Sequence, residues 1–181
     1  MQSMRTLPYS FYKRDTHIVA RELLGKLLVR EKDGKKIIGR ICEVESYVGE
    51  DDMASHASKG KTKRTEPMYG KAGRAYVYMI YGMYYCFNVV TEVENFPAAI
   101  LIRACEAVEN ISGKTDGPGK LCREFFIDRS FTNHNITTSN ELYICDDGTR
   151  IPKNQITAAP RIGVAYAKED AALPWRYFYS K

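Results

Sequence analysis

Residues 76–88 read Tyr-Val-Tyr-Met-Ile-Tyr-Gly-Met-Tyr-Tyr-Cys-Phe-Asn, and the rest of the chain is organised around this stretch. Apolar and aromatic residues, which favour β-strands, fill nearly every position, and only Tyr81-Gly82 interrupts the run. The pattern predicts two antiparallel strands joined by a tight turn, with a large aromatic side chain at its tip. Taken alone, the stretch is more typical of a packed strand pair whose hydroxyls have ordinary partners.

The composition is that of a globular protein. The 181 residues fit a single domain, residues 1–181, and 44% hydrophobic with 27% charged residues argue against disorder. Lys and Arg outnumber Asp and Glu by 27 to 22, which permits a polyanionic partner without requiring one. We expect an intracellular protein, in cytoplasm, nucleoid or nucleus, because the sequence shows neither a signal peptide nor a membrane span.

The cysteines and histidines are too far apart in the sequence for a metal site. No Cys-x-x-Cys or His-x-x-x-His spacing occurs, so zinc and iron–sulfur sites are not expected. The cysteines mostly lie in apolar runs, which predicts reduced thiols in the core. They are Cys42, Cys86, Cys105, Cys122 and Cys145, and the histidines are His17, His56 and His134.

The first part of the chain predicts a helix and a strand pair. Asp15 can cap the helix and Gly25 can end it. Strands are expected at 26–30 and about 37–47, joined by an Asp-Gly turn at 33–34. The helical residues expected on one apolar side are Ile18, Val19, Leu23 and Leu24.

The later segments predict short elements after a long loop. Residues 48–75 lack periodicity, and a loop of that length in a compact domain is usually functional. A helix at 121–126 follows glycines, so its start either holds an anion or is an ordinary capped turn. Further strands are expected at 98–105, 142–145, 161–166 and 175–179. The whole pattern predicts an α+β fold with a curved, mainly antiparallel sheet, a few short helices and a protruding β-hairpin.

The strand that contains residues 40–47 carries candidate catalytic groups. With the two-residue period of a strand, Glu43, Glu45 and Tyr47 face one side. This side is either a solvated strand face or a site that combines carboxylates with an aromatic ring.

Arg103 favours a site at Glu45. It is the only charge in the apolar run 98–105, and a guanidinium in such surroundings needs a partner. A carboxylate of a nearby strand would be that partner. The pair is either structural or an arrangement that keeps a carboxylate ionised and holds a water molecule against it.

Three further features each allow two interpretations. The Asn88 amide either bonds to a backbone group or faces a pocket, and His56 is either structural or part of a site. A basic cluster is either solvated surface or a phosphate contact. The cluster consists of Lys59, Lys61, Lys63, Arg64, Lys71 and Arg74.

A series of short ungapped motifs runs through nearly the whole chain, from about Pro8 to Tyr179. They are Gly39-Arg40-Ile41, Glu45-Ser46-Tyr47-Val48-Gly49, His56, Tyr76-Val77-Tyr78, Tyr81-Gly82-Met83-Tyr84, Asn88, Leu101-Ile102-Arg103-Ala104, Gly119-Lys120-Leu121-Cys122 and Pro160-Arg161-Ile162-Gly163-Val164. In order and spacing, these motifs closely resemble the alkyladenine DNA glycosylase (3-methyladenine DNA glycosylase) family. Two departures are visible: the chain ends at Lys181, earlier than the resemblance leads us to expect, and the segment after Glu106 is short.

The resemblance implies base flipping into an aromatic pocket. Tyr81 and Met83 would form the tip that inserts into the DNA minor groove, where Tyr81 fills the gap in the base stack. Tyr47 and Tyr78 would sandwich the flipped base, with His56 at its edge. Alkylation makes a purine cationic, and electron-rich ring faces favour a cation by roughly 1 to 2 kcal/mol when water is excluded.

The resemblance also implies the chemistry. Glu45 would deprotonate the attacking water and stabilise the oxocarbenium-like sugar, with Arg103 positioning that water. Asn88 would exclude the 2-amino group of guanine and so admit hypoxanthine. The family needs no metal, cofactor or covalent lysine intermediate, which implies a monofunctional enzyme of base excision repair that leaves an abasic site.

The implied partner is double-stranded DNA with damaged purines, namely 3-methyladenine, 7-methylguanine, hypoxanthine or ethenoadenine. A monomer is expected. The residues expected to contact the DNA backbone are Lys61, Lys63, Arg64, Arg74, Lys120 and Arg161. Two alternatives remain: a non-enzymatic nucleic-acid-binding module with stacked tyrosines, and a hydrolase of free nucleosides, which the basic loop disfavours.

Overall fold

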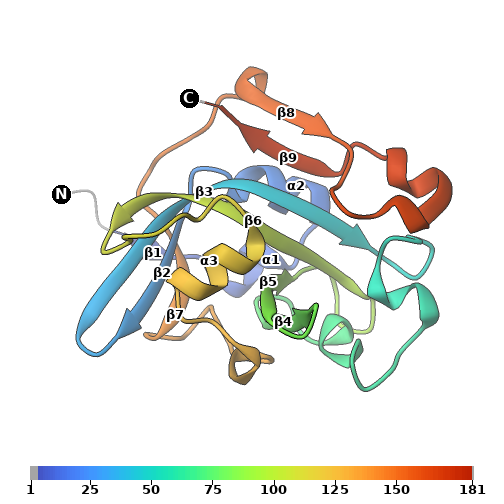
Figure 1. Cartoon of the computed structure of the whole chain (residues 1–181), viewed down its shortest axis with the longest axis horizontal. Helices are drawn as coiled ribbons and strands as arrows, with labels where there is room; N and C mark the ends of the chain where they lie inside the picture. The colour runs from blue at the N-terminus through green and yellow to red at the C-terminus, as the bar shows by residue number, and fades with distance from the viewer. Residues whose placement is uncertain (1–3, 181) are drawn as a thin grey trace.

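The computed structural model describes residues 4–180, and nine strands in this range form one antiparallel sheet (Figure 1). The main path runs β1-β7-β2-β3-β6-β5-β4, while β9 pairs with both β3 and β8. The strands are β1 (Arg5–Thr6), β2 (Leu27–Lys32), β3 (Lys35–Val48), β4 (Ala75–Ile80), β5 (Tyr84–Val90), β6 (Ala98–Glu109), β7 (Leu142–Asp146), β8 (Ile156–Ala159) and β9 (Arg176–Tyr179). The predicted α+β fold with a mainly antiparallel sheet is confirmed.

Short helices cover the sheet. The α-helices are α1 (Tyr9–Tyr12), α2 (Thr16–Leu23) and α3 (Pro118–Glu124), and the 3-10 helices are η1 (His56–Lys59), η2 (Glu66–Tyr69), η3 (Arg129–Phe131), η4 (Lys153–Gln155) and η5 (Ala165–Ala172). The predicted cap of α2 is confirmed, because the Asp15 carboxylate accepts a hydrogen bond from the Ile18 N–H. Val19 and Leu23 are buried as expected, whereas Ile18 is exposed. Ile18 therefore does not belong to the buried side of the helix.

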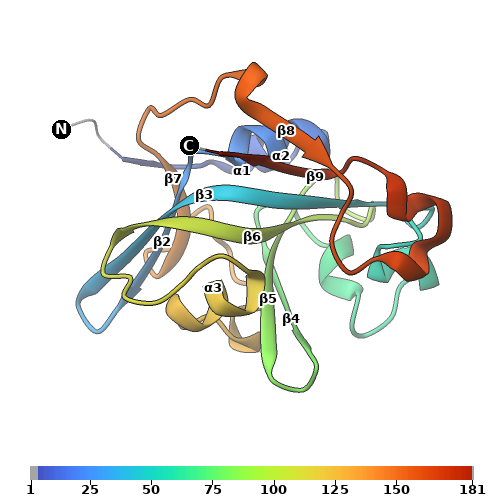
Figure 2. The ribbon, with the colours of Figure 1, turned by 45° about the horizontal axis from the view of Figure 1, so that its top comes forward.

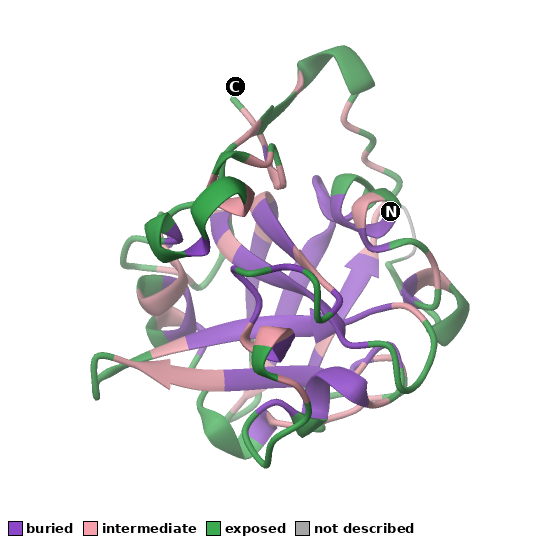
Figure 3. Cartoon of the chain, turned by 90° about the vertical axis from the view of Figure 1, so that its right-hand side faces the viewer, coloured by how far each residue is buried: buried purple, intermediate pink, exposed green. Residues whose placement is uncertain are grey.

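Strand β3 is the central strand of the sheet. It spans Lys35–Val48 and pairs with β2, β6 and β9, and the Asp33-Gly34 turn before it has positive φ at both residues, as a tight hairpin turn requires. A large apolar cluster joins the sheet to α2 and α3, and Figure 3 shows the central strands mostly buried and the connecting loops mostly exposed. None of the five cysteines forms a disulfide; four are buried and Cys42 is half-buried, as expected for reduced core residues.

The β4–β5 hairpin projects from the body of the molecule (Figure 2). Its turn is formed by residues 81–83, with φ of +52° at Tyr81 and +66° at Gly82. A non-glycine residue in the left-handed region costs roughly 1 to 2 kcal/mol, so Tyr81 holds its place at some cost to local stability. The Tyr81 side chain is 86% exposed. The predicted hairpin with an aromatic tip is confirmed.

Two sequence predictions about the second half are wrong. Residues 161–166 form no strand: they cross the end of β3, and Gly163 has a φ of +75°, which interrupts extended structure. Strand β8, which lies just before this segment, was not predicted. Helix α3 exists but begins at Pro118 instead of residue 121.

The long loop between β3 and β4 is ordered around η1 and η2. Its buried residues Met68 and Tyr69 pack against Tyr76 of β4 and Val90 of β5. The loop thus forms a wall beside the hairpin. Within residues 4–180, no helix is both long and apolar enough to cross a lipid bilayer.

Candidate active site

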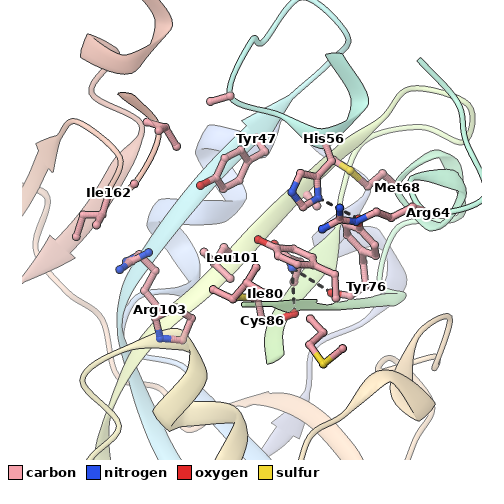
Figure 4. A pocket seen from close by; sticks show the side chains of 18 of the residues that line it. Tyr47, His56, Arg64, Met68, Tyr76, Ile80, Cys86, Leu101, Arg103 and Ile162 are labelled. Atoms are coloured by element: carbon pink, nitrogen blue, oxygen red, sulfur yellow. Dashed lines mark hydrogen bonds between the residues drawn. The ribbon is translucent and has the colours of Figure 1, made fainter. Parts of the chain in front are cut away.

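The hairpin, the long loop, strands β3 and β6, and residues 162–166 together enclose a cavity of about 460 Å3 (Figure 4). Elements far apart in the sequence therefore meet at one place. Five residues predicted for the site line the cavity: Tyr47 of β3, His56 of η1, Tyr78 of β4, Asn88 of β5 and Arg103 of β6. Tyr81 also lies on its wall, at the hairpin tip.

Glu45 lies directly behind this wall, with none of its side chain exposed. Its Oε2 accepts a hydrogen bond from the Tyr47 hydroxyl at 2.7 Å, and its Oε1 accepts one from the Ile162 backbone N–H at 2.8 Å. The Arg103 guanidinium is 3.5 Å from Oε1. These three contacting residues all line the cavity, so one layer of side chains separates the carboxylate from it.

The predicted face of β3 is confirmed by these contacts. Arg103 lies between both carboxylates, with its Nε 3.4 Å from Glu43, and Glu43 also binds Arg176 at 3.0 Å. The alternation persists although the pairing of β3 with β6 shifts register on both sides of Glu43. A solvated strand face is therefore wrong for Glu45, while Glu43 remains partly exposed.

The Tyr47 side chain is held at its hydroxyl and at its ring. Burial, followed by the nearby Glu45 carboxylate, raises the pKa of Tyr47 far above its ordinary value, so the hydroxyl stays protonated and donates to Glu45. On its other side, the Arg161 guanidinium lies 4.8 Å from the ring centroid. Figure 4 shows the ring at the edge of the cavity, beside Ile162 and His56.

The opposite wall is aromatic. The rings of His56 and Tyr78 are 4.5 Å apart, and those of Tyr76 and Tyr78 are 5.4 Å apart. His56 Nδ1 is 3.2 Å from the Tyr76 hydroxyl. Burial, with a smaller contribution from the Arg64 charge, lowers the pKa of His56 to about 4. His56 is therefore neutral at pH 7 and does not repel a cationic ligand.

Asn88 fits both interpretations that its sequence position allowed. Its side-chain Nδ2 donates to the backbone carbonyls of Tyr76 at 3.1 Å and Cys86 at 3.3 Å. The residue is buried and also lines the cavity. Because its amide is tied to the hairpin backbone on both sides, Asn88 presents a fixed surface to any occupant.

The residues predicted to contact DNA backbone fall into different environments. Arg64 lines the cavity, 5.7 Å from the Tyr78 ring centroid, and Lys61 and Lys63 are exposed on the same loop. Arg74 donates to the Asn133 carbonyl at the base of the hairpin, and exposed Lys120 pairs with an aspartate.

Arg161 conflicts with the expectation of a phosphate contact. Its guanidinium has no exposed surface and forms a bidentate ion pair with Asp52, with N···O distances of 2.7 and 2.8 Å. A side chain held in this way cannot reach a DNA backbone. Its role is internal to the protein.

Sequence reasoning missed two groups at the site. The Ile162 N–H that binds Glu45 is a backbone donor, and no residue pattern reports where such a donor points. Asp52 was overlooked within the loop, although a buried acid could have been sought as a partner for an arginine. Within residues 4–180, no group of three or more His, Cys, Asp or Glu side chains is placed to hold a metal ion.

The arrangement combines an aromatic slot with a carboxylate behind its wall. The slot suits a flat, polarisable ligand, and neutral His56 suits one that is uncharged or cationic. The carboxylate and Arg103 can activate and orient a water molecule once it reaches them. The exposed tip and the basic loop lie on the rim, where a nucleic acid would approach.

Comparison with known proteins gives a consistent result. The model of the family described as "Methylpurine-DNA glycosylase (MPG)" matches residues 10–181. A Legionella pneumophila (strain Corby) protein is 53% identical over 175 residues, which cover 97% of this chain and 94% of the relative. A Myxococcus xanthus protein is 49% identical (96% and 89% covered), and a Methanocella arvoryzae protein 48% (97% and 92%). All three bear the name "Putative 3-methyladenine DNA glycosylase".

Proposed function

Because the chain belongs to the methylpurine-DNA glycosylase family and is therefore a DNA glycosylase, we propose that it excises damaged purines from duplex DNA by hydrolysing the N-glycosidic bond. The proposed substrates are 3-methyladenine, 7-methylguanine, hypoxanthine and ethenoadenine. The product is an abasic site, and the protein works as a monomer inside the cell, where the DNA lies. The observation that carries the proposal is an aromatic slot one side-chain layer away from a buried carboxylate.

The flipped base occupies the slot between Tyr47 and Tyr78. Both rings line the cavity, and burial raises the pKa of both hydroxyls far above the ordinary value, so the rings stay neutral. Neutral tyrosine faces attract a cationic alkylated purine by roughly 1 to 2 kcal/mol in a desolvated site. The low pKa of His56 removes a charge that would oppose this preference.

The hairpin tip takes the place of the flipped nucleotide in the stack. Tyr81 is 86% exposed and Met83 65% exposed, so both reach into solvent without rearrangement. Unstacking a base step costs a few kcal/mol, which an inserted aromatic ring partly offsets. Asn88, held by two backbone carbonyls, then excludes the 2-amino group of guanine and admits hypoxanthine.

The chemistry requires Glu45 to become accessible. In the free protein its two oxygens bind the Tyr47 hydroxyl and the Ile162 N–H. We infer that base stacking on Tyr47 opens the Tyr47–Glu45 hydrogen bond, and a water molecule takes the hydroxyl's place. Glu45 accepts a proton from this water as it attacks the anomeric carbon, and its charge stabilises the oxocarbenium-like transition state.

Arg103 orients the same water. Its buried Nε lies 3.4 Å from Glu43 and makes no hydrogen bond within residues 4–180, so it can donate to a water or sugar oxygen. The guanidinium lies between Glu43 and Glu45, which fixes its position on β6. The purine leaves with the electrons of the N-glycosidic bond.

An excision assay tests the proposal. The protein is incubated with duplexes that each contain one of the four lesions, and with undamaged duplex as control. Release of free base and formation of an alkali-labile abasic site are expected only from lesion duplexes. Tight binding of every lesion duplex without base release would instead identify a nucleic-acid-binding module. Release from free nucleosides at the same rate would identify a nucleoside hydrolase.

A further inference from the structure

Residues 160–164 form a strap across the end of β3, and the strap touches both halves of the proposed site. Its Ile162 N–H binds the Glu45 carboxylate at 2.8 Å, and its Arg161 side chain stacks behind the Tyr47 ring at 4.8 Å. Adjacent strap residues therefore contact the proposed catalytic group and one of the rings that would hold the base. Among the described residues 4–180, no strand pairs with the strap to hold it there.

Besides the Ile162–Glu45 bond and a bond from Arg176 to the Pro160 carbonyl at 2.9 Å, the Arg161 side chain contributes most of the contacts that fasten this strap. Its Nη1 donates to the Ser46 carbonyl at 2.9 Å and to Asp52 at 2.7 Å, and its Nη2 donates to Asp52 at 2.8 Å. Asp52 in turn accepts from the backbone N–H groups of Val48 and Ala54. The ion pair is fully buried, so it resists screening by solvent.

The same guanidinium also contacts two aromatic rings. It lies 4.8 Å from the Tyr47 ring centroid and 4.9 Å from the Trp175 ring centroid. Trp175 is itself fixed, because its carbonyl accepts from the Ser46 N–H and its ring contacts the His17 ring, with centroids 4.6 Å apart and the planes tilted by 58°. A planar guanidinium satisfies the ion pair and both ring contacts at once, which an ammonium cannot do.

We infer that Arg161 is a positioning residue for base excision. Its ion pair with Asp52 sets the strap so that the Ile162 N–H orients Glu45, and its stack sets the angle of the Tyr47 ring toward the base. This inference rests on the proposed function of Glu45 and Tyr47. Misplacing a reacting group by about 1 Å can lower a rate by roughly 100-fold, so a loosened strap lowers the excision rate.

The principal variant replaces the charged pair by a neutral one, Asp52→Asn with Arg161→Gln. Removing Arg161 alone would leave the Asp52 charge buried without its partner, which strongly destabilises a fold. The matched control is Arg40→Gln with Asp147→Asn. This pair has the same two residue types and N···O distances of 2.9 and 3.3 Å, it is partly exposed, and Arg40 lies in the first half of β3, outside the cavity lining.

The measurements separate positioning from stability. The single-turnover excision rate of the Asp52/Arg161 variant is expected to fall by about 10- to 100-fold while its circular dichroism remains native. The Arg40/Asp147 control is expected to lose thermal stability but to keep its rate within about twofold of the native protein. Equal rates for the two double variants would overturn the inference.

Trp175 provides a second readout because it is the chain's single tryptophan. Lesion duplex is expected to change its fluorescence in the native protein more than undamaged duplex does, since the base stacks on Tyr47 and Arg161 links that ring to Trp175. The lesion-specific part of the change is expected to disappear in the Asp52/Arg161 variant. Its full retention would count against the stack as a positioning device.

A conservative substitution keeps the inference testable if the double variant does not fold. Arg161→Lys preserves the charge opposite Asp52 but removes the planar stack and one of the two donors. A folded Arg161→Lys protein with a reduced excision rate supports the inference, and one with the native rate refutes it. If the native protein itself releases no base, the proposed function fails, whereas release by native and variants alike defeats only the role of Arg161.

Discussion

At the scale of single residues, the proposed mechanism depends on Glu45. A buried carboxylate is tolerated when its oxygens have partners, and Glu45 has the Tyr47 hydroxyl, the Ile162 N–H and the Arg103 guanidinium. One of these partners, the Tyr47 hydroxyl, belongs to a side chain that the flipped base would touch in the proposed function. The proposed function therefore couples binding of the base to access of water to the carboxylate through Tyr47.

Substituting Tyr47 by Phe tests that coupling. Tyr47→Phe keeps the stacking ring and removes the hydroxyl that covers Glu45, so water can reach the carboxylate without first breaking a hydrogen bond. We expect its single-turnover excision rate to equal or exceed the native rate, because a hydrogen bond to a charged group contributes about 1.5 to 3 kcal/mol. Tyr47→Ala, which removes the ring as well, is expected to lose lesion affinity. If Tyr47→Phe lost as much lesion affinity and excision rate as Tyr47→Ala, the hydroxyl would have another role.

His56 gives a pH-dependent prediction. Its pKa is about 4 in the folded protein against 6.5 ordinarily, so the unfolded chain binds the proton first as pH falls. The stability that neutral His56 contributes is complete above pH 6.5 and is lost toward pH 4, and it amounts to roughly 1 to 3 kcal/mol for a partly exposed group. Denaturant unfolding at pH 7 and pH 5 measures it. The difference between the two pH values is expected to shrink in His56→Gln, and an unchanged difference would refute the shifted pKa.

Residue periodicity predicted much of this site, but it did not predict the contact from residue 162 that completes it. Alternation along β3 grouped Glu43, Glu45 and Tyr47, and the single charge in an apolar strand identified Arg103 as the partner, as the structure shows. The Ile162 contact could not be predicted, because it depends on how a segment more than a hundred residues away crosses the sheet. The same long-range packing buries Arg161, which sequence alone suggested as a DNA contact.

At the scale of elements, the β4–β5 hairpin depends on α3 for support. A Cβ added to Gly119 in α3 would lie 2.9 Å from the Tyr84 ring, so only glycine allows the helix to approach β5 this closely. The sequence predicted the hairpin because its strand pattern is local. It mistook residues 161–166 for a strand because their apolar content resembles one, while Gly163 and the contacts of Arg161 fix a different path.

The hairpin tip gives a prediction at this scale. Tyr81→Ala is expected to weaken binding of lesion duplex by roughly 5- to 150-fold, the equivalent of 1 to 3 kcal/mol of base–aromatic stacking. The excision rate at saturating enzyme is expected to change far less, since the proposed role of Tyr81 is to fill the stack, away from the reacting bond. Tyr9→Ala removes an exposed tyrosine from α1 as the matched control. A fall in rate as large as the fall in affinity would contradict the wedge role.

At the scale of the whole molecule, charge is distributed to suit a duplex that approaches the cavity. The net charge is +5, and the loop from β3 to β4 carries exposed Lys61 and Lys63 beside Arg64 at the cavity. Composition predicted the sign of this charge. Only the fold shows that the basic loop and the hairpin form walls of one cavity.

Salt dependence tests this distribution. Each phosphate contact contributes about 0.9 to the slope of log affinity against log salt, so Lys61→Ala and Lys63→Ala should each lower the magnitude of the slope by about 1. Lys153→Ala, on η4 and outside the cavity lining, is the control and should leave the slope unchanged. If all three variants kept the native slope, Lys61 and Lys63 of the basic loop would not contact DNA phosphates.

The most direct test of the account is the single-turnover rate of base release by Glu45→Gln on a lesion duplex, compared with the native protein and with Glu43→Gln. Glu43 is the matched control because it lies on the same face of β3 and also contacts Arg103. We predict that Glu45→Gln binds the duplex with near-native affinity and releases base about 100- to 10,000-fold more slowly, as expected for loss of a general base, while Glu43→Gln is affected far less. Base release by Glu45→Gln at the native rate would contradict the account.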